Sequence, residues 1–380
     1  MRDYLNTNAP THFLFPIDGD HLNERDGNVK GDTLYFTATV RSAPNCKVTV
    51  NGVPATEENG LYCATVCVKE GKNTLSVKNK TDGTEATALV YFSTRVTGKY
   101  RISSDDNILF LYDITKNKDT YTSIFDNPYL AVYKKAHDLY GAKVHLNLFY
   151  AFDREAAKRF SLERPDFDLS MVTDKFKAEW EANADWLKLS FHANAEYPDN
   201  PYVNATAEQI TADYHNVRRE VLRFAGEATF SVAATTVHWG SANAECTAAL
   251  RDLGHRVLAG YFTLTKHGNP SVSYYAPASL VGHVTHRDFW TDTQMGMHFS
   301  RIDRVTNIGT LEEVMEDVKA VVADPYCGGF VSIMIHEQYF YEDYKNHRPD
   351  FEARVLEPAK YLCEHGYTGT HLADVLDALY

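Results

Sequence analysis

Two adjacent acidic residues stand beside an apolar run in "RISSDDNILFLYDI", where Asp105 and Asp106 precede "NILFLY". Neighbouring carboxylates raise each other's pKa, and burial makes their ionisation costlier still, so such a pair is typical of a cation site or a proton-transfer site. A turn or a helix cap is the simpler interpretation of the pair taken alone. The other polar segments of the chain therefore have to decide between the two.

Three further segments end predicted strands with polar side chains. The segments are "WLKLSFHANAEYP", with His192 and Glu196, "ATTVHWG", with His238 and Trp239, and "SIMIHEQYFYEDY", with His336 and Glu337. A single histidine is more often a hydrogen-bonded structural residue than a ligand. Three histidines at strand ends together with an Asp pair are explained most economically by one convergent polar pocket.

Oxygen and nitrogen ligands of this kind suit Zn²⁺ or another divalent first-row metal, and three protein ligands would leave a position open for water. Such an ion lowers the pKa of bound water to about 7, which makes a nucleophile at neutral pH. A neighbouring carboxylate could then take the proton of that water, and a histidine on the opposite side could protonate the leaving group. The chemistry expected of the pocket is metal-assisted hydrolysis.

The secondary-structure elements that would position these residues follow two different sequence patterns. Residues from about 12 to 97 alternate polar and apolar positions, as in "TLYFTATV" and "LYCATVCV", and Asn-Gly and Asp-Gly turns interrupt them. This pattern predicts a small all-β, immunoglobulin-like sandwich over residues 1–98. Its strands offer few regularly spaced aromatic residues, so a spacer or docking role is expected.

Beyond Lys99 the period changes to that of helices alternating with buried strands. "TAEQITADYHNVRREVLRFAG" has a Thr206/Gln209 capping box and a closing Gly226, and "TLEEVMEDVKAVV" starts with a Thr310/Glu313 box. About seven strand–helix units indicate a largely parallel sheet, and their evenness favours a barrel over an open sheet. We therefore expect an α/β domain over residues 99–380 that keeps its activity without the first domain.

Composition limits the partners. The chain has 380 residues, 44% of them hydrophobic, and a formal net charge of -13. This charge repels phosphate backbones and anionic lipid, so we expect no nucleic-acid and no membrane partner. The start has no signal-peptide pattern, and the six cysteines show no Cys-x-x-Cys spacing, so reduced thiols and a cytoplasmic location are expected.

The ordered set of motifs from about residue 100 to the end resembles the polysaccharide deacetylase family, carbohydrate esterase family four. "SSDDN" is similar to its first motif, and the resemblance implies that Asp105 is the base and that Asp106 binds the metal. "FHANAE" stands at its His-x-x-x-His metal pair, so His192 carries over and Glu196 replaces the second histidine. "IMIH" is similar to the last motif, which implies that His336 is the general acid. The family's domain is a distorted (β/α)7 barrel.

This sequence departs from the family in one motif. The third motif, Arg-x-Pro-Tyr, would align near "TTVHWG", but Thr236 stands about where its arginine is expected. In the family that arginine orients the base, so its replacement removes the group that would orient Asp105 for deacetylation. His238 is an alternative third metal ligand, in which case Glu196 is a loop acid.

The leading hypothesis is a metal-dependent carbohydrate hydrolase that removes N- or O-acetyl groups from an oligo- or polysaccharide. It uses Zn²⁺, with Co²⁺ or Ni²⁺ as alternatives, bound by Asp106, His192 and Glu196. Asp105 and His336 are its predicted catalytic residues, and the predicted substrate-binding residues are His238, Trp239 and Glu337. One alternative is a glycosidase on a related barrel that uses two carboxylates such as Asp105 and Glu337. Another is a carbohydrate-binding protein without catalytic activity.

Overall fold

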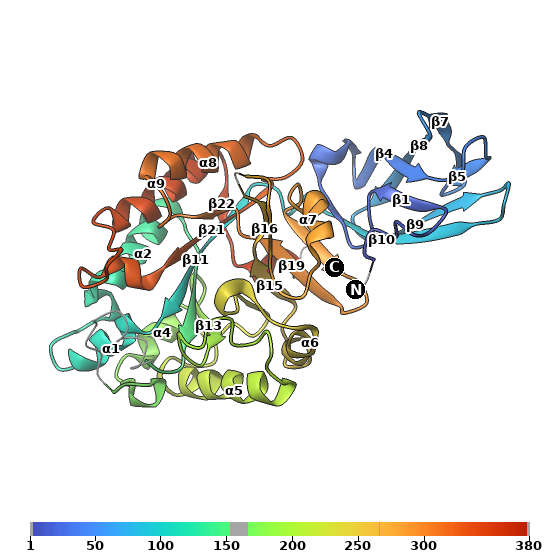
Figure 1. Cartoon of the computed structure of the whole chain (residues 1–380). Coiled ribbons are helices and arrows are strands. Elements are labelled where there is room, and N and C mark those ends of the chain that lie inside the picture. Colours follow the sequence, from blue (N-terminus) through green and yellow to red (C-terminus); the bar gives the residue numbers. More distant parts are fainter. Residues whose placement is uncertain (1–2, 153–165, 266, 378–380) are drawn as a thin grey trace.

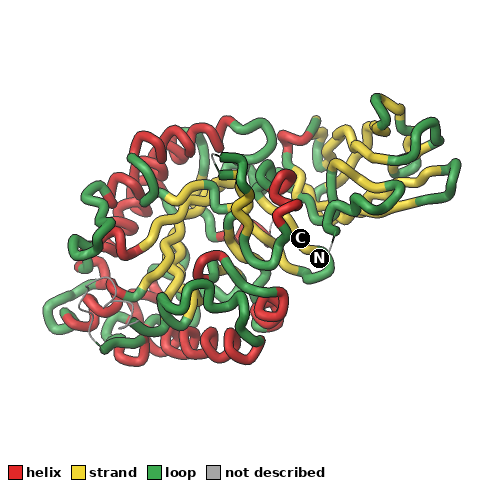
Figure 2. Tube along the Cα trace, viewed as in Figure 1, coloured by secondary structure: helices red, strands yellow, loops and turns green. Residues whose placement is uncertain are grey.

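The computed structural model describes residues 3–152, 166–265 and 267–377 and shows a mixed α/β protein, drawn in Figure 1. Its first part consists of two antiparallel sheets with one parallel pair, and the rest consists of mainly parallel strands flanked by helices (Figure 2). None of the helices in the described ranges has both the length and the apolar composition that crossing a membrane requires.

The first ninety residues fold into two sheets that face one another across a shared hydrophobic core. One sheet has the order β1-β4-β8-β7 with β3 beside β4, and the other has the order β2-β10-β9-β5-β6. The first contains β1 (His12–Phe15), β3 (Asn28–Lys30), β4 (Thr33–Arg41), β7 (Thr56–Glu58) and β8 (Leu61–Lys69). The second contains β2 (His21–Leu22), β5 (Val48–Val50), β6 (Val53–Pro54), β9 (Gly71–Asn79) and β10 (Glu85–Phe92). Alternate residues of β4 and β8 are buried, as expected for strands with one face on a core.

The central sheet of the second part is entirely parallel, with the order β13-β12-β11-β21-β20 and with β22 also beside β11. Its strands are β11 (Lys99–Asn107), β12 (Val144–Phe149), β13 (Leu187–Ala193), β20 (Arg304–Val305), β21 (Phe330–His336) and β22 (Thr368–Gly369). Because parallel strands end at the same edge of a sheet, the carboxyl ends of β11, β13 and β21 bring their last residues together.

A second, four-stranded sheet follows in the order β14-β15-β19-β18, and a small hairpin joins β16 and β17. Its strands are β14 (Ala234–Thr235), β15 (Val257–Gly260), β18 (Phe289–Asp292) and β19 (Met297–Arg301), and the hairpin strands are β16 (Phe262–Leu264) and β17 (Pro270–Val272). The hydrogen-bonded strands thus form two main sheets in this part, and the closure of one barrel stays a prediction.

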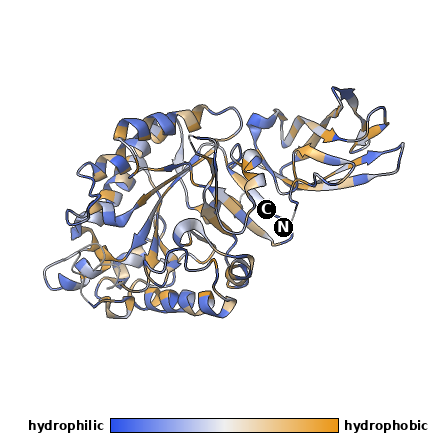
Figure 3. Cartoon of the chain, in the orientation of Figure 1, coloured by the Kyte–Doolittle hydropathy of each residue, from blue (hydrophilic) through white to orange (hydrophobic). Residues whose placement is uncertain are grey.

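Helices lie on the outside of these sheets, with polar faces towards solvent (Figure 3). They are α1 (Leu109–Lys116), α2 (Pro128–Tyr140), α4 (Lys177–Ala182), α5 (Ala207–Phe224), α6 (Ala244–Asp252), α7 (Ala278–Val284), α8 (Leu311–Ala323), α9 (Phe351–Glu364) and α10 (Leu372–Asp377). Short 3-10 turns are η1 (Glu24–Asp26), η2 (Ile124–Asp126), η3 (Leu169–Met171), η4 (His238–Gly240) and η5 (Glu337–Phe340).

Sequence signals explain where two of these helices begin. Thr206 accepts a hydrogen bond from the Gln209 backbone at the start of α5, and the full Thr310/Glu313 capping box begins α8. The apolar residues on one face of α5 are buried, namely Ile210, Tyr214, Val217, Val221 and Phe224. The Thr310/Glu313 box is therefore confirmed, whereas the Thr206/Gln209 box is confirmed only for its Thr206 half.

Buried ion pairs join the first part to the second. Arg287 Nη1 donates to both carboxylate oxygens of Asp26 at 2.8 Å, and His283 Nε2 lies 2.8 Å from each carboxylate oxygen of Asp20. Arg287 and Asp26 are 5% and 1% exposed in their side chains. Figure 1 shows the N-terminal sheets beside α7 and the hairpin of β18 and β19, where these contacts lie.

Candidate metal centre

Asp105 and Asp106 lie at the end of β11, and both are buried. The regular pairing of β11 with β12 shifts between Ser104 and Asn107, and Asp106 has a positive φ of 63°. Such an irregularity turns side chains away from the strict alternation of a strand, and aspartate tolerates the left-handed region better than most residues. Asp106 consequently faces β13 and η4, while Asp105 stays in register with His336 of β21.

Three ligand-type atoms converge on one point at this edge. Asp106 Oδ1 lies 3.0 Å from His192 Nε2 and 3.2 Å from His238 Nδ1, and the two nitrogens are 3.1 Å apart. Ligand atoms bound about 2.0–2.1 Å from a tetrahedral Zn²⁺ lie roughly 3.3 Å from one another. Among the described residues, these three form the group that could hold a metal ion, and all three are buried.

The outer nitrogen of each imidazole is held by a backbone carbonyl. His192 Nδ1 lies 2.5 Å from Thr236 O, and His238 Nε2 lies 3.0 Å from Glu196 O. A carbonyl oxygen only accepts, so both outer nitrogens carry a hydrogen. In a neutral imidazole the inner nitrogen then carries no hydrogen and has a free lone pair. Two lone pairs and a carboxylate oxygen therefore point at each other, which is the arrangement that outer hydrogen bonds impose on metal-binding histidines.

The pKa values of Asp106 and His192 are both shifted by charged or polar neighbours within the site. Burial alone would raise the pKa of Asp106, but the adjacent imidazoles of His192 and His238, either of which can take up a proton, hold it well below its usual value. Burial alone would lower the pKa of His192, but the charge of Asp105 and the contact with Asp106 raise it. Both directions mean that the site stabilises an added positive charge, either a proton on an imidazole or a metal ion.

Asp105 is fixed by an amide that the sequence interpretation missed. Asn147 Nδ2 donates to Asp105 Oδ1 at 2.6 Å, and Ser190 Oγ donates to Asn147 Oδ1 at 2.5 Å. The strand "KVHLNLFY" carried a signal for this residue, since His145 and Asn147 alternate with apolar residues and so share one face of β12. Asp105 is thus held beside the convergent group, where a base would be needed.

His336 lies at the end of β21 with its ring directed by Asn307. His336 Nδ1 lies 2.9 Å from Asn307 Oδ1, which also accepts from the His336 backbone at 3.1 Å. Because the amide oxygen only accepts, Nδ1 carries the hydrogen, and Nε2 faces the site at 4.0 Å from Asp106 Oδ2. His336 stays outside the three-atom group, as expected for a proton donor, and its role stays a prediction.

Glu337 lies inside the protein at the start of α1. It is fully buried, and its carboxylate accepts hydrogen bonds from the backbone N–H groups of Ile108, Leu109 and Phe110, at the N-terminus of α1. Burial raises the pKa of Glu337 to about 7, against the opposite effect of these donors. Glu337 is predicted to bind substrate, but the structure places its carboxylate at the N-terminus of α1, where it caps the helix.

Two further predictions are corrected. Glu196 supplies no ligand atom to the group of Asp106, His192 and His238. Its contribution is the backbone carbonyl that orients His238, and His238, which is predicted to bind substrate, supplies the third ligand-type atom of the group. The reason is local, since Glu196 lies in the turn that follows β13, where spacing along the chain does not fix the direction of a side chain.

Trp239 lies at the rim beside His238 and is 52% exposed. Its φ of 63° places a bulky residue in the left-handed region, which costs free energy and often marks a functional position. An exposed aromatic ring next to the candidate ligands suits stacking on a sugar ring, and this role stays a prediction.

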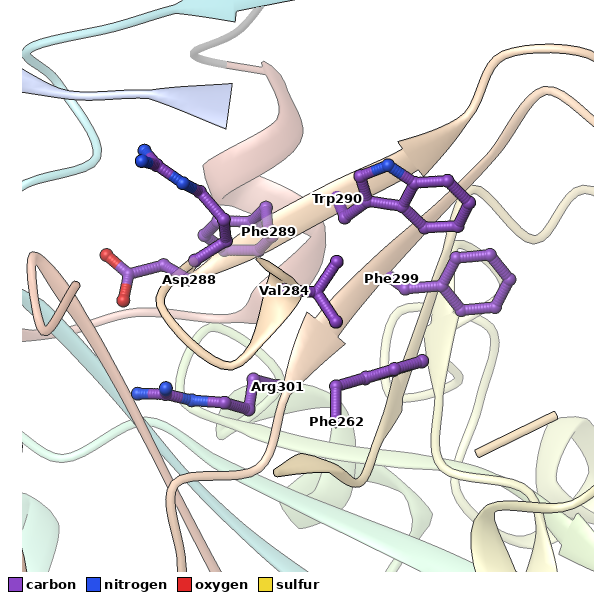
Figure 4. A pocket seen from close by; sticks show the side chains of 8 residues that line it. Phe262, Val284, Asp288, Phe289, Trp290, Phe299 and Arg301 are labelled. Carbon is purple, nitrogen blue, oxygen red and sulfur yellow. The ribbon is translucent and has the colours of Figure 1, made fainter. Parts of the chain in front are cut away.

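A cavity between α7 and the strands β18 and β19 is a packing void and has no room for a substrate (Figure 4). Its volume is about 10 Å³, close to that of a single water position. Arg287 borders it, and the Nε of this residue has no partner among the described residues, which fits one buried water. The candidate centre at the ends of β11 and β13 is thus separate from this cavity.

No family model matches the sequence, and no curated protein matches it. Several solved structures are similar to the chain, with low TM-scores. A CE4 family pseudoenzyme from Bacillus anthracis is 10% identical, with a TM-score of 0.37 over 74% of this chain and 66% of that chain. A family 4 acetyl xylan esterase from Clostridium thermocellum, in complex with a cobalt ion, is 13% identical, with a TM-score of 0.37 over 73% of this chain and 90% of that chain.

A 4-alpha-glucanotransferase from Thermococcus litoralis is also similar, at 10% identity and a TM-score of 0.42, over 74% of this chain and 40% of that chain. These low TM-scores leave the chemistry to be argued from the residues themselves. Structures of the CE4 family are among those that this chain resembles.

Proposed function

We propose that the protein is a metal-dependent hydrolase that removes acetyl groups from a carbohydrate. The observation that carries this proposal is the convergence of Asp106 Oδ1, His192 Nε2 and His238 Nδ1, with both outer imidazole nitrogens held by carbonyls. Such a set of acceptors fits Zn²⁺, and Co²⁺ or Ni²⁺ have similar preferences. A divalent ion held there would supply Lewis-acid polarisation of the acyl carbonyl and an activated water.

The surrounding residues fit the remaining steps of such a hydrolysis. Asp105, held by Asn147, takes the proton of the attacking water. His336 presents Nε2 to the same site because Asn307 holds its Nδ1, so the doubly protonated ring would donate its Nε2 proton to the leaving group. Trp239 offers a ring on which a sugar can stack at the rim. Carbohydrate as the substrate class rests on this exposed ring and on the motif resemblance.

We also make a proposal about the architecture of the two parts of the chain. We infer that the two N-terminal sheets form an immunoglobulin-like sandwich over residues 1–98 and that the strands of residues 99–380 form a distorted barrel. The shared core of the N-terminal sheets and the parallel order around β11 support this.

Two alternatives stay open. The glycosidase hypothesis uses two carboxylates such as Asp105 and Glu337, but Glu337 is buried under three backbone N–H donors, so this hypothesis requires another second carboxylate. A carbohydrate-binding protein without catalytic activity would use the same rim, so only an experiment separates it from the hydrolase.

The test combines metal content with acetate release. Purified protein is assayed for bound metal, for acetate from acetylated oligosaccharides, and for reducing sugar. About one equivalent of metal with acetate release is expected. Sugar binding without release of either product would instead show a binding protein, and reducing-sugar release without metal would show a glycosidase.

A substitution of His336 tests its proposed role as the general acid. His336→Ala should retain metal and melting temperature but lose roughly 10²- to 10⁴-fold in rate, the range for removal of a general acid. His365→Ala, which removes an exposed histidine on the C-terminal side of α9, is the matched control and should leave the rate unchanged. Loss of metal from His336→Ala would make His336 a ligand and overturn its role.

A further inference from the structure

The side-chain amide of Gln338 contacts the candidate metal group. Gln338 Nε2 donates to Asp106 Oδ2 at 2.8 Å. Asp106 Oδ1 faces the two histidine nitrogens of the candidate group, which leaves Oδ2 as the oxygen that accepts from Gln338. The NH₂ of Gln338 must therefore face Asp106, which fixes the orientation of the whole amide and of its oxygen.

The oxygen of that amide is buried and has no hydrogen-bond partner among the described residues. Buried acceptors without a donor are uncommon in native proteins because they forgo the hydrogen bonds of water. Amide bond lengths place Oε1 roughly 2.3 Å from Nε2, and therefore within roughly 5 Å of Asp106 Oδ2. The unpaired acceptor lies at the edge of the candidate reaction centre.

The backbone that carries Gln338 is held firmly. Glu337, directly before it, binds three backbone N–H groups at the start of α1, and Tyr341 Oη donates to Glu337 Oε1 at 3.0 Å. A turn fixed on both sides presents its amide in one position, so the acceptor is preorganised for an incoming donor. His336 Nε2 lies 4.0 Å from the same Asp106 Oδ2, so Gln338 and the candidate proton donor flank one oxygen.

We propose that Gln338 Oε1 accepts a hydrogen bond from the N–H of a substrate N-acetyl group, so that the site favours amides over esters. This inference rests on the proposed deacetylation and narrows its substrate class. An acetate ester has oxygen in place of the N–H and leaves the acceptor unpaired. Hydrolysis of the amide consumes one water and gives acetate and an amine, whose nitrogen takes its proton from His336.

A site that hydrogen-bonds a substrate N–H discriminates strongly against an analogue that lacks it, because its own polar group is then left buried and unpaired. A second role of Gln338 is to hold Asp106 through Nε2. The two roles differ in their consequences, since loss of the Asp106 contact affects every substrate equally, whereas loss of the Oε1 contact affects only substrates with an N–H.

The experiment compares two matched substrates, the 2-acetamido and 2-O-acetyl forms of one oligosaccharide, with zinc-loaded native protein and with Gln338→Met. For the variant, kcat/KM on the amide should fall at least about tenfold more than kcat/KM on the ester. Gln294→Met, which changes an exposed glutamine next to β18, should alter neither value. An equal fall on both substrates would overturn the proposal and leave Gln338 as a positioning residue for Asp106.

Binding measurements separate this proposal from the proposed function. The affinities of native protein and Gln338→Met for both sugars are measured by calorimetry, together with the zinc content of each protein. If neither sugar releases acetate, deacetylation fails, but an amide preference in binding that the variant loses would still support the hydrogen bond to Oε1. No preference in the native protein would overturn it.

If Gln338→Met does not fold, the hydrogen bond can be tested with a modified substrate that lacks the N–H. An N-methyl acetamido sugar keeps the amide carbonyl but lacks the N–H. Native protein should bind it at least about tenfold more weakly than the parent acetamido sugar. Equal binding of the two sugars would contradict the proposal without any variant.

Discussion

His238 Nδ1 lies 3.2 Å from Asp106 Oδ1, although the two residues belong to η4 and β11, which are far apart in the chain. This contact, and the carbonyl of Glu196 behind the ring, make His238 the third candidate ligand. It also gives the adjacent acids of the sequence separate roles, because Asp106 joins the histidines while Asp105 is held by Asn147.

The ligand assignment predicts different metal affinities for two neighbouring variants. His238→Ala should weaken zinc binding by more than roughly 100-fold, because loss of outer-sphere partners alone typically weakens metal binding 10- to 100-fold. Glu196→Gln is the matched control and should bind zinc normally, since the backbone carbonyl that orients His238 is unchanged. Calorimetric zinc titration measures both, and zinc loss from Glu196→Gln alone would restore Glu196 as the ligand.

The buried carboxylate of Glu337 predicts a stability effect. Glu337→Gln keeps the shape of the side chain but replaces one acceptor oxygen with an NH₂ that faces backbone N–H donors. The free energy of unfolding should fall by about 1–3 kcal/mol, the penalty for a buried group left unsatisfied. Denaturant unfolding measures it, with the exposed Glu342→Gln as control. Unchanged stability together with weaker sugar binding would return Glu337 to the substrate site.

Much of the fold could be predicted from sequence because its signals are local. The N-cap at Thr206, the capping box at Thr310 and the buried apolar face of α5 depend on residues within one helix. Asp106 and His192 could be predicted because each lies at the end of a strand in a parallel sheet, where side chains meet.

The remaining site residues depend on contacts that no local pattern encodes. Glu337 points at the N-terminus of α1, a partner more than two hundred residues earlier in the chain. Asn307 acts through its side-chain oxygen on His336, and Gln338 acts through one hydrogen bond to Asp106. Glu196 is the predicted ligand because it stands at the second histidine of the family's His-x-x-x-His pair, but position along a chain does not say which of two loop side chains turns inwards.

Buried histidines predict acid sensitivity, and His255 is a clear case. It is 1% exposed, and burial lowers its pKa to about 4, whereas an unfolded histidine has a pKa of about 6.5. Between these values the unfolded chain binds a proton that the folded protein does not. Stability is therefore present above about pH 6.5 and is lost as the pH falls towards 4.

His255→Asn removes this titration and keeps a side-chain N–H for the Leu250 carbonyl, which His255 Nδ1 contacts at 3.0 Å. Between pH 7 and pH 5 the variant should lose about 2 kcal/mol less stability than the native protein. Denaturant unfolding at both pH values measures the difference, and the exposed His215→Asn should show no such change. A parallel fall of native protein and His255→Asn would refute the assignment.

The buried pair of Arg287 and Asp26 predicts that the N-terminal sheets stabilise the second part. Asp26→Asn leaves the Arg287 guanidinium, 5% exposed in its side chain, without its anion, so the free energy of unfolding should fall by about 3–5 kcal/mol. Asp32→Asn, at an exposed position in the turn before β4, is the control.

The same reasoning changes the expectation for a fragment of residues 99–380. Removing the first part takes away the partners of Arg287 and of His283, so the fragment should melt at a lower temperature than the whole chain, even if its metal group is intact. Melting temperature and zinc content are measured on the fragment and on the full chain. A fragment as stable as the whole protein would show that the two parts are independent, as the change of period at Lys99 suggests, and that the buried pairs contribute little to stability.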